Sequence, residues 1–477
     1  MNTNRPLKRY LRFILIALTL SLAGVGAAWA QEGQQQGPVY IVQQGDTLWG
    51  IAQRFGVPIA DLAQANGISD SAVIQAGDRL VIPGLPGIEG VLTTRTIPVG
   101  ETLRSLSRRY QIPELWLARI NRVSSPAELF AGSTLILPEE SAEGSLNGRA
   151  VVSQGQSLLE LAILQGSDPW SLAATNGLSG TWDTVPGDIL RFQGGSADGP
   201  GALPGQIASV EIDPLPLVQG KTTVIRLSGE TGLALAGSLA DRELHFFPQP
   251  DGQYIALQGV HAMLDPGLYP LLLQGALPDG TPFGVSQLIY IQDGQYLFDL
   301  PLNVPPETID PAVTRPEDAE WAALVAPITA VKMWDGPFRM PSPLPLDYCL
   351  ETNECWSSRF GSRRSYNGSP YLYFHTGLDF YGGTGTEIYA PAPGTVVFTG
   401  FLTVRGNATV IDHGWGVYSA YMHQSEILVK TGDRVEVGQV IGLVGGTGRV
   451  EGPHLHWEIF VGGVQVDPLD WLRRAFP

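Results

Sequence analysis

Apolar residues follow two different periods along this chain, and the change of period divides it into segments. Near the N-terminus, Leu48, Ile51 and Phe55 recur at helical spacing. A second short helical stretch follows, and apolar runs at residues 40–42 and 79–82 enclose the two. This pattern predicts a small module made of a strand, two helices and a second strand, with Asp46 as the cap of the first helix.

The same pattern occurs three times at intervals of 55 residues. Five classes of position keep this register: Gly45, Gly100 and Gly155; Leu48, Leu103 and Leu158; Asn66, Asn121 and Asn176; Gly77, Gly132 and Gly187; Leu80, Leu135 and Leu190. A fixed period over three copies indicates tandem modules. We expect these modules at residues 38–84, 94–139 and 149–194.

Residues 205–300 change to short apolar or alternating stretches that are separated by turn signals at 250–252 and 278–280. The segment 265–269, Asp-Pro-Gly-Leu-Tyr, resembles the Gly-x-Tyr strand of immunoglobulin-like domains. The sequence therefore predicts an immunoglobulin-like β-sandwich. Its two histidines, His245 and His261, have no carboxylate or histidine at ligand spacing, so we expect them to be ordinary surface or half-buried residues.

Residues 301–346 are rich in proline and are expected to form a linker, either an extended tether or a wrapping arm, with one short helix at 317–325. From residue 347 to residue 477, apolar strands alternate with glycine-containing turns, which predicts an all-β domain. The predicted fold class is therefore mainly β and multidomain: three β-α-α-β modules, a sandwich, a proline-rich linker and a C-terminal all-β domain.

Charge and the N-terminal segment restrict where the protein acts. The net charge of -17 argues against nucleic acid and anionic membrane surfaces as partners. Residues 1–30 combine a basic start, an apolar run and a small-x-small site, which predicts a signal peptide; a retained membrane anchor is the alternative. We expect an exported protein, in the periplasm, cell wall or medium, without a membrane span after cleavage. In such a compartment Cys349 and Cys355 can form a local disulfide.

Candidate chemistry is concentrated in the last segment, which holds five of the seven histidines. His454 and His456 are two residues apart, so a strand points both side chains to one face. His375 and Asp379 lie upstream, and an extended segment places them on one side as well. Together with one histidine of the pair they supply three ligands for a catalytic Zn²⁺. The other histidine of the pair and His423 remain available for proton transfer.

The modules resemble the LysM family, which binds glycans that contain N-acetylglucosamine, such as peptidoglycan and chitin. The resemblance rests on residues 42–48, 62–66 and 77–83 of the first module, and it weakens in the second and third. It implies that the repeats bind the glycan of peptidoglycan. The sequence leaves open whether the second and third copies bind glycan or are spacers.

The C-terminal segment resembles the lysostaphin-like zinc metalloendopeptidases over roughly residues 357–472. The resemblance rests on His375-x-x-x-Asp379, on His423 after Ala-Tyr-Met, and on His454-x-His456. It implies that His375, Asp379 and His456 bind one Zn²⁺ and that the domain hydrolyses the peptide stems of peptidoglycan. His454 is then the expected general base, and His423 the expected stabiliser of the tetrahedral oxyanion.

Two other functions remain open at this point. The first is an inactive wall-binding scaffold that activates cell-wall amidases, and the second is a glycan-binding protein whose last domain is only structural. The sequence does not decide which peptide bond is cleaved, which of His423 and His454 is the base, the oligomeric state, or whether the proline-rich linker regulates the site.

Overall fold

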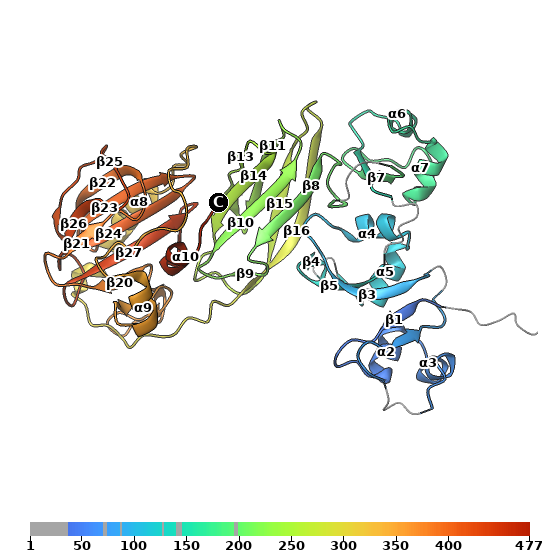
Figure 1. Cartoon of the computed structure of the whole chain (residues 1–477), viewed down its shortest axis with the longest axis horizontal. Helices are drawn as coiled ribbons and strands as arrows, with labels where there is room; N and C mark the ends of the chain where they lie inside the picture. The colour runs from blue at the N-terminus through green and yellow to red at the C-terminus, as the bar shows by residue number, and fades with distance from the viewer. Residues whose placement is uncertain (1–36, 70–73, 86–87, 126–127, 140–145, 195–198) are drawn as a thin grey trace, which may run out of the picture. The chain divides into compact units, whose positions relative to one another are not determined.

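The structure, a computed structural model, describes residues 37–69, 74–85, 88–125, 128–139, 146–194 and 199–477 (Figure 1). The predicted signal peptide at 1–30 lies outside the described residues. The chain forms two compact units: residues up to 93 with 120–122 and 136–139, and the remainder. More residues lie in strands than in helices, and several separate sheets form, so the mainly β, multidomain prediction is confirmed.

The first module has the predicted element order: β1 (Val39–Ile41), α2 (Leu48–Phe55), α3 (Ile59–Ala65) and β2 (Arg79–Val81). Strands β1 and β2 pair antiparallel, and the helical apolar residues are buried beneath them. Asp46 was predicted to cap α2, but it does not. Thr47 does, because its hydroxyl accepts from Gly50 N, whereas Asp46 accepts from Tyr40 and Gln43 N in the preceding turn.

The repeated asparagine has a structural role in each copy. In the first module, the amide of Asn66 exchanges two hydrogen bonds of 2.7 and 2.8 Å with the backbone of Val81 and donates a third to Leu62 O. Asn176 makes the same contacts with Arg191 and Leu172. The amide therefore joins the end of the second helix to the closing strand.

The second and third modules repeat the strand–helix–helix–strand order. Their elements are β3 (Val91–Thr96), α4 (Leu103–Tyr110), α5 (Glu114–Ile120), β4 (Phe130–Ala131), β5 (Thr134–Pro138), β6 (Gly148–Val151), α6 (Leu158–Leu164), α7 (Pro169–Thr175) and β7 (Ile189–Phe192). Arg108 of α4 pairs with Asp188 at 2.8 Å, next to β7, and so connects these two modules.

Residues 207–292 form two mainly antiparallel sheets around a shared apolar core, with β9 paired in parallel to β16. The strands are β8 (Ile207–Asp213), β9 (Leu217–Val218), β10 (Thr222–Gly229), β11 (Ala234–Leu239), β12 (Arg242–Leu244), β13 (Phe247–Pro248), β14 (Gln253–Gly259), β15 (Gly267–Ala276) and β16 (Pro282–Gln292). One sheet has the order β13-β14-β10-β8, and the other contains β12-β11-β15-β16. The sandwich is thus present, while its immunoglobulin-like character stays a prediction.

The C-terminal domain is built on one large sheet, with the order β17-β20-β27-β24-β23-β22-β25 along its main path. Its strands are β17 (Trp356–Ser358), β20 (Leu378–Tyr381), β21 (Glu387–Tyr389), β22 (Gly394–Leu402), β23 (Gly406–Gly414), β24 (Val417–Ile427), β25 (Arg434–Val435), β26 (Val440–Val444), β27 (His454–Val461) and β28 (Val464–Val466). A small hairpin, β18 (Arg363–Arg364) with β19 (Tyr373–Phe374), precedes β20.

The C-terminal domain is fastened to the sandwich at its last helix, α10 (Pro468–Arg473). Lys221 Nζ, next to β10, lies 2.9 Å from Asp467 and 3.0 Å from Asp470. The indole of Trp471 donates to the Thr222 hydroxyl at 3.0 Å. These contacts join the two domains through buried and half-buried groups.

The proline-rich segment is not an extended tether throughout: part of it is helical and packs on the C-terminal domain, in the manner of the wrapping arm. It contains a 3₁₀ turn at Pro306–Thr308, helix α8 (Pro311–Leu324) and the start of helix α9 (Leu346–Thr352). Helix α8 is longer than the predicted 317–325 and includes Pro316. It begins with Pro311 at its first position, where the missing N–H costs nothing, and Asp310 caps it. Its residue Trp321 is buried against β23, β24 and β27.

Two further expectations concern export and the membrane. Cys349 and Cys355 form the predicted disulfide at the end of α9. Among the described residues, we find no helix whose length and apolar character would let it cross a bilayer.

Candidate active site

The register of three neighbouring strands brings the motif residues together. Asp379 of β20 lies directly opposite His456 of β27, and His456 lies opposite Met422 of β24 on its other side. His423 follows Met422, and His375 lies just before β20. Segments that are separated by up to about 80 residues in sequence therefore meet at one end of the sheet.

His375, Asp379 and His456 converge on one point. His375 Nε2 lies 3.0 Å from Asp379 Oδ1 and 3.0 Å from His456 Nδ1, and His456 Nδ1 lies 2.7 Å from the same carboxylate oxygen. All three side chains are buried. Within the described part of the chain, this is the group of histidine and carboxylate side chains whose geometry could hold a metal ion.

Outer hydrogen bonds fix the orientation of both imidazoles. His375 Nδ1 donates to the carbonyl of Arg359 at 2.8 Å, so the lone pair of the neutral ring is on Nε2. His456 has a carboxylate oxygen at each ring nitrogen: Glu458 Oε1 is 3.2 Å from Nε2 and Asp379 Oδ1 is 2.7 Å from Nδ1, so without a metal ion both nitrogens can donate. A metal ion at Nδ1 would replace the proton there, while Glu458 would keep the proton on Nε2. The Nε2 lone pair of His375, Nδ1 of His456 and the Asp379 carboxylate thus face each other.

The pKa values follow from this crowding. Burial lowers the pKa of His375 to about 4, against the raising effect of Asp379. Burial also lowers the pKa of His456, but the carboxylates of Asp379 and Glu458 outweigh it and raise the value to about 9. Burial would raise the pKa of Asp379, yet the adjacent His375 and His456 hold it well below its usual range.

These three groups fit a zinc ion. Two imidazole nitrogens and one carboxylate oxygen are the donor types that catalytic zinc sites use, with a fourth position left for water. Bonds of about 2 Å to a tetrahedral ion separate the donor atoms by about 3.3 Å. The observed 2.7–3.0 Å is within several tenths of an ångström of that, so small side-chain adjustments suffice.

His454 and His423 lie beside this cluster. His454 Nε2 is 3.7 Å from Asp379 Oδ1, and the rings of His423 and His454 have centroids 5.0 Å apart. His423 Nδ1 donates to Thr447 O at 2.8 Å, and His454 Nδ1 donates to Gly452 O at 2.9 Å. Both carbonyls belong to the loop between β26 and β27. In the neutral rings, each Nε2 is therefore a proton acceptor.

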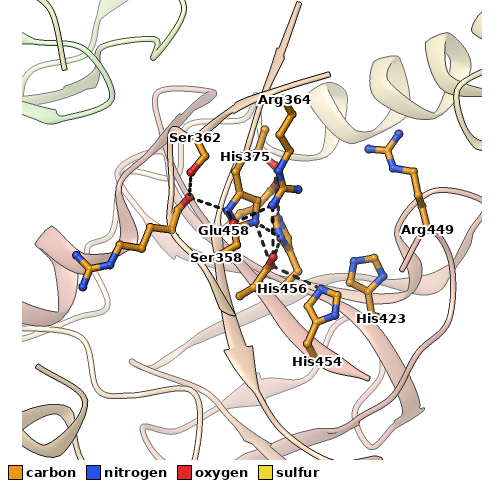
Figure 2. A network of polar contacts seen from close by, with 12 residues as sticks. Ser358, Ser362, Arg364, His375, His423, Arg449, His454, His456 and Glu458 are labelled. Carbon is orange, nitrogen blue, oxygen red and sulfur yellow. Dashed lines mark hydrogen bonds and ion pairs between the residues drawn. The ribbon is translucent and has the colours of Figure 1, made fainter. Parts of the chain in front are cut away.

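Arg364 contacts Asp379 at the carboxylate oxygen Oδ2, whereas the histidines contact Oδ1. Its Nη2 lies 3.6 Å from Asp379 Oδ2 and donates to Ser358 Oγ at 2.9 Å (Figure 2). Ser358 in turn lies 3.1 Å from His375 Nδ1. Sequence reasoning gave these residues no role of their own, nor Glu458; the signal available was their position inside the stretches that resemble the zinc endopeptidases.

Four of the five motif residues line a cavity of about 1010 Å³. Its wall includes the α8 residues Thr314, Asp318 and Trp321, together with Arg449 from the loop after β26. His423, His454, His456 and Asp379 also line it, whereas the buried His375 does not. A polypeptide in this cavity would therefore reach two of the three candidate metal ligands and both flanking histidines.

The remaining histidines lie outside the cluster, although His261 lines the same cavity. His413 lies in β23 and is fully buried, with Nδ1 donating to Pro393 O at 2.7 Å and Nε2 at 2.7 Å from Ser419 Oγ. Those two contacts satisfy both ring nitrogens, so the strand tolerates it. His261 is half-buried and meets Phe374 edge-on, and His245 is half-buried too.

Comparison with protein families agrees with both resemblances. Residues 373–468 match the model of peptidase family M23, and residues 40–83 and 96–138 match that of the LysM domain. The chain thus carries a peptidase family M23 domain and LysM domains. The LysM matches cover the first two modules.

Similar proteins match part of the chain. The chain is 41% identical to peptidoglycan DD-endopeptidase ShyC and 44% identical to peptidoglycan DD-endopeptidase ShyA, both of Vibrio cholerae serotype O1. Each match covers 24% of this chain and 26% of the relative, so the chain spans about a quarter of the length of these curated relatives. A crystallised Pseudomonas aeruginosa protein assigned to peptidase M23 is 26% identical with a TM-score of 0.37, over 55% of this chain and 96% of that one.

Proposed function

We propose that this protein is a zinc-dependent endopeptidase that cleaves the peptide cross-links of peptidoglycan. The observation that carries the proposal is the convergence of His375, Asp379 and His456 on one point, with His423 and His454 beside it on a substrate-sized cavity. The similar Vibrio cholerae proteins are named DD-endopeptidases of peptidoglycan, which supports a D,D-peptide bond as the target.

In this proposal His375 Nε2, Asp379 Oδ1 and His456 Nδ1 hold the zinc. The ion supplies Lewis acidity, which polarises the scissile carbonyl and lowers the pKa of water. The hydrogen bonds from His375 to Arg359 O and from His456 to Glu458 hold the two rings in the tautomers that metal binding needs.

The flanking histidines handle the proton. His454 takes the proton of the attacking water at Nε2, because its Nδ1 already donates to Gly452 O. His423 is assigned to the tetrahedral oxyanion, which needs a donor. Its Nδ1–H is committed to Thr447 O, so it can donate to the substrate only when Nε2 is also protonated. Turnover measurements on variants of His454 and of His423 therefore distinguish the role of each ring.

The LysM modules hold the enzyme on its substrate. Their family match supports binding of the glycan strands, while the M23 domain acts on the peptide stems. Several weak modules on one chain raise the local concentration of the catalytic domain at the wall. A periplasmic or cell-wall location follows from such a substrate.

The test is to incubate the purified full chain with insoluble peptidoglycan and identify released fragments by mass spectrometry. The wild type should release fragments cut at a cross-link, and His375→Ala should lose both zinc and release, because two protein ligands hold zinc poorly. His454→Ala should keep zinc and lose roughly 10²–10⁴ in turnover. Zinc-loaded wild type that releases nothing, yet stimulates an amidase, would establish the scaffold alternative instead.

A further inference from the structure

Helix α8, in the segment that the sequence assigns to a linker, contacts the metal cluster through one buried carboxylate. Trp321 of α8 is 2% exposed and packs with Val325 against β23, β24 and β27. Its indole Nε1–H donates to Glu458 Oε2 at 3.2 Å. The contact connects residues that are 137 positions apart in sequence.

Glu458 lies between that indole and the metal cluster. It is 2% exposed, and a buried carboxylate is retained only when its oxygens are paired. Oε2 receives the Trp321 proton, and Oε1 receives the Nε2 proton of His456 at 3.2 Å. The Thr376 side chain also hydrogen-bonds this carboxylate. Because both oxygens have donors, the carboxylate cannot rotate away from His456 without losing a buried hydrogen bond.

The direction of these hydrogen bonds, from Trp321 and from His456 to Glu458, matters for metal binding. His456 offers Nδ1 to the cluster only while its other nitrogen keeps the proton. Glu458 accepts that proton in a hydrogen bond and thereby selects the tautomer, and Trp321 fixes the carboxylate in the position from which it can do so. Outer-shell partners of this kind typically change metal affinity by 10–100-fold.

The same helix also braces the turn between β22 and β23, which contacts His423 of β24. Glu317 accepts from Val404 N at 3.0 Å and from the Arg405 guanidinium at 2.9 Å, and that guanidinium stacks 4.8 Å from the Trp321 ring. The carbonyl of Arg405 accepts from His423 N at 3.0 Å. His423 has a positive φ of 61°, which a non-glycine residue adopts only where its surroundings hold it.

We infer that α8 belongs to the catalytic unit, with Trp321 and Glu458 as positioning residues that set the metal affinity of His456. The inference rests on the metal site of the proposed function. It places the start of the functional domain near residue 305 rather than 347, so a fragment that begins at 347 lacks part of its metal-site support.

The test compares two tryptophans in the full chain. Trp321→Phe removes the indole that holds Glu458, and Trp334→Phe is the matched control: Trp334 is 3% exposed and donates to Phe476 O, also at 3.2 Å, away from the cluster. Zinc affinity of the apo proteins is measured by competition with a chromophoric chelator. Trp321→Phe should weaken zinc binding about 10–100-fold, and Trp334→Phe should stay within about twofold of wild type.

Glu458→Gln provides a second route, should Trp321→Phe fold poorly. It keeps the side-chain shape and removes the charge, and we expect the same 10–100-fold loss. Equal zinc affinity of Trp321→Phe and Trp334→Phe, or wild-type affinity of Glu458→Gln, would overturn the inference and leave the proposed function standing. A wild type that binds no zinc at all would instead refute the proposed function.

Discussion

Gly377 lies between two of the proposed metal ligands, and its replacement by alanine is the sharpest test of how the site is built. A Cβ atom at this position would lie 2.4 Å from Trp457 O and 2.8 Å from His456 Nε2. To reach an acceptable 3.0 Å, the backbone of β20 or β27 must move by at least about 0.6 Å. Strand β27 cannot withdraw freely, because β24 pairs with its other edge.

The expected size follows from these contacts. Overpacking of a closed site costs typically about 1–3 kcal/mol, and here the obstacle is backbone rather than a flexible side chain. A loss of about 2 kcal/mol corresponds to amide exchange that is about 30-fold faster where the sheet opens. The same displacement pushes His456 Nε2 away from Glu458, so zinc affinity should fall about 10–100-fold.

Hydrogen exchange followed by mass spectrometry reports the first effect for β27 alone, and chelator competition reports the second. Gly383→Ala is the matched control, since its added Cβ would meet no atom within 4 Å and its backbone has no left-handed φ. We expect Gly383→Ala to match wild type in both measurements. If Gly377→Ala also matches it in both, the closeness of the two strands does not govern the metal site, and the reasoning is wrong.

Two further predictions concern the repeats and acid stability. Deleting residues 38–195 should weaken co-sedimentation with insoluble peptidoglycan and leave cleavage of a small soluble peptide intact, because tethering changes local concentration rather than chemistry. Unchanged co-sedimentation would show that the repeats do not target the protein to peptidoglycan. Burial lowers the pKa of His413 to about 4 in the folded protein, against an unfolded value near 6.5. As the pH falls from about 6.5 to about 4, only the unfolded chain takes up that proton, so the free energy of unfolding should fall by up to about 3 kcal/mol. His413→Asn should show a correspondingly shallower loss of this free energy in urea titrations at a series of pH values. If stability falls with pH equally in wild type and variant, His413 is not the group responsible.

Patterns within short stretches of the sequence predicted much of the fold. The 55-residue register gave the modules, and alternation in the last segment gave its principal strands, because each depends on residues close in sequence. The two-residue spacing of His454 and His456 likewise predicts a shared strand face without knowledge of any partner strand. Where two neighbouring residues competed for one local role, as Asp46 and Thr47 did for the cap of α2, pattern alone chose the wrong one.

Long-range pairing lay beyond the sequence. The metal cluster depends on Asp379 lying opposite His456, a register fixed by the packing of β20, β27 and β24 rather than by either segment alone. Proline content made residues 301–346 resemble a tether, yet proline at the first turn of α8 is compatible with a helix, and the indole of Trp321 finds its acceptor 137 residues away. Composition and periodicity therefore determined which elements form and which residues could do the chemistry. The tertiary structure decided which of those residues meet, because hydrogen bonds and buried charges are satisfied between elements and not within them.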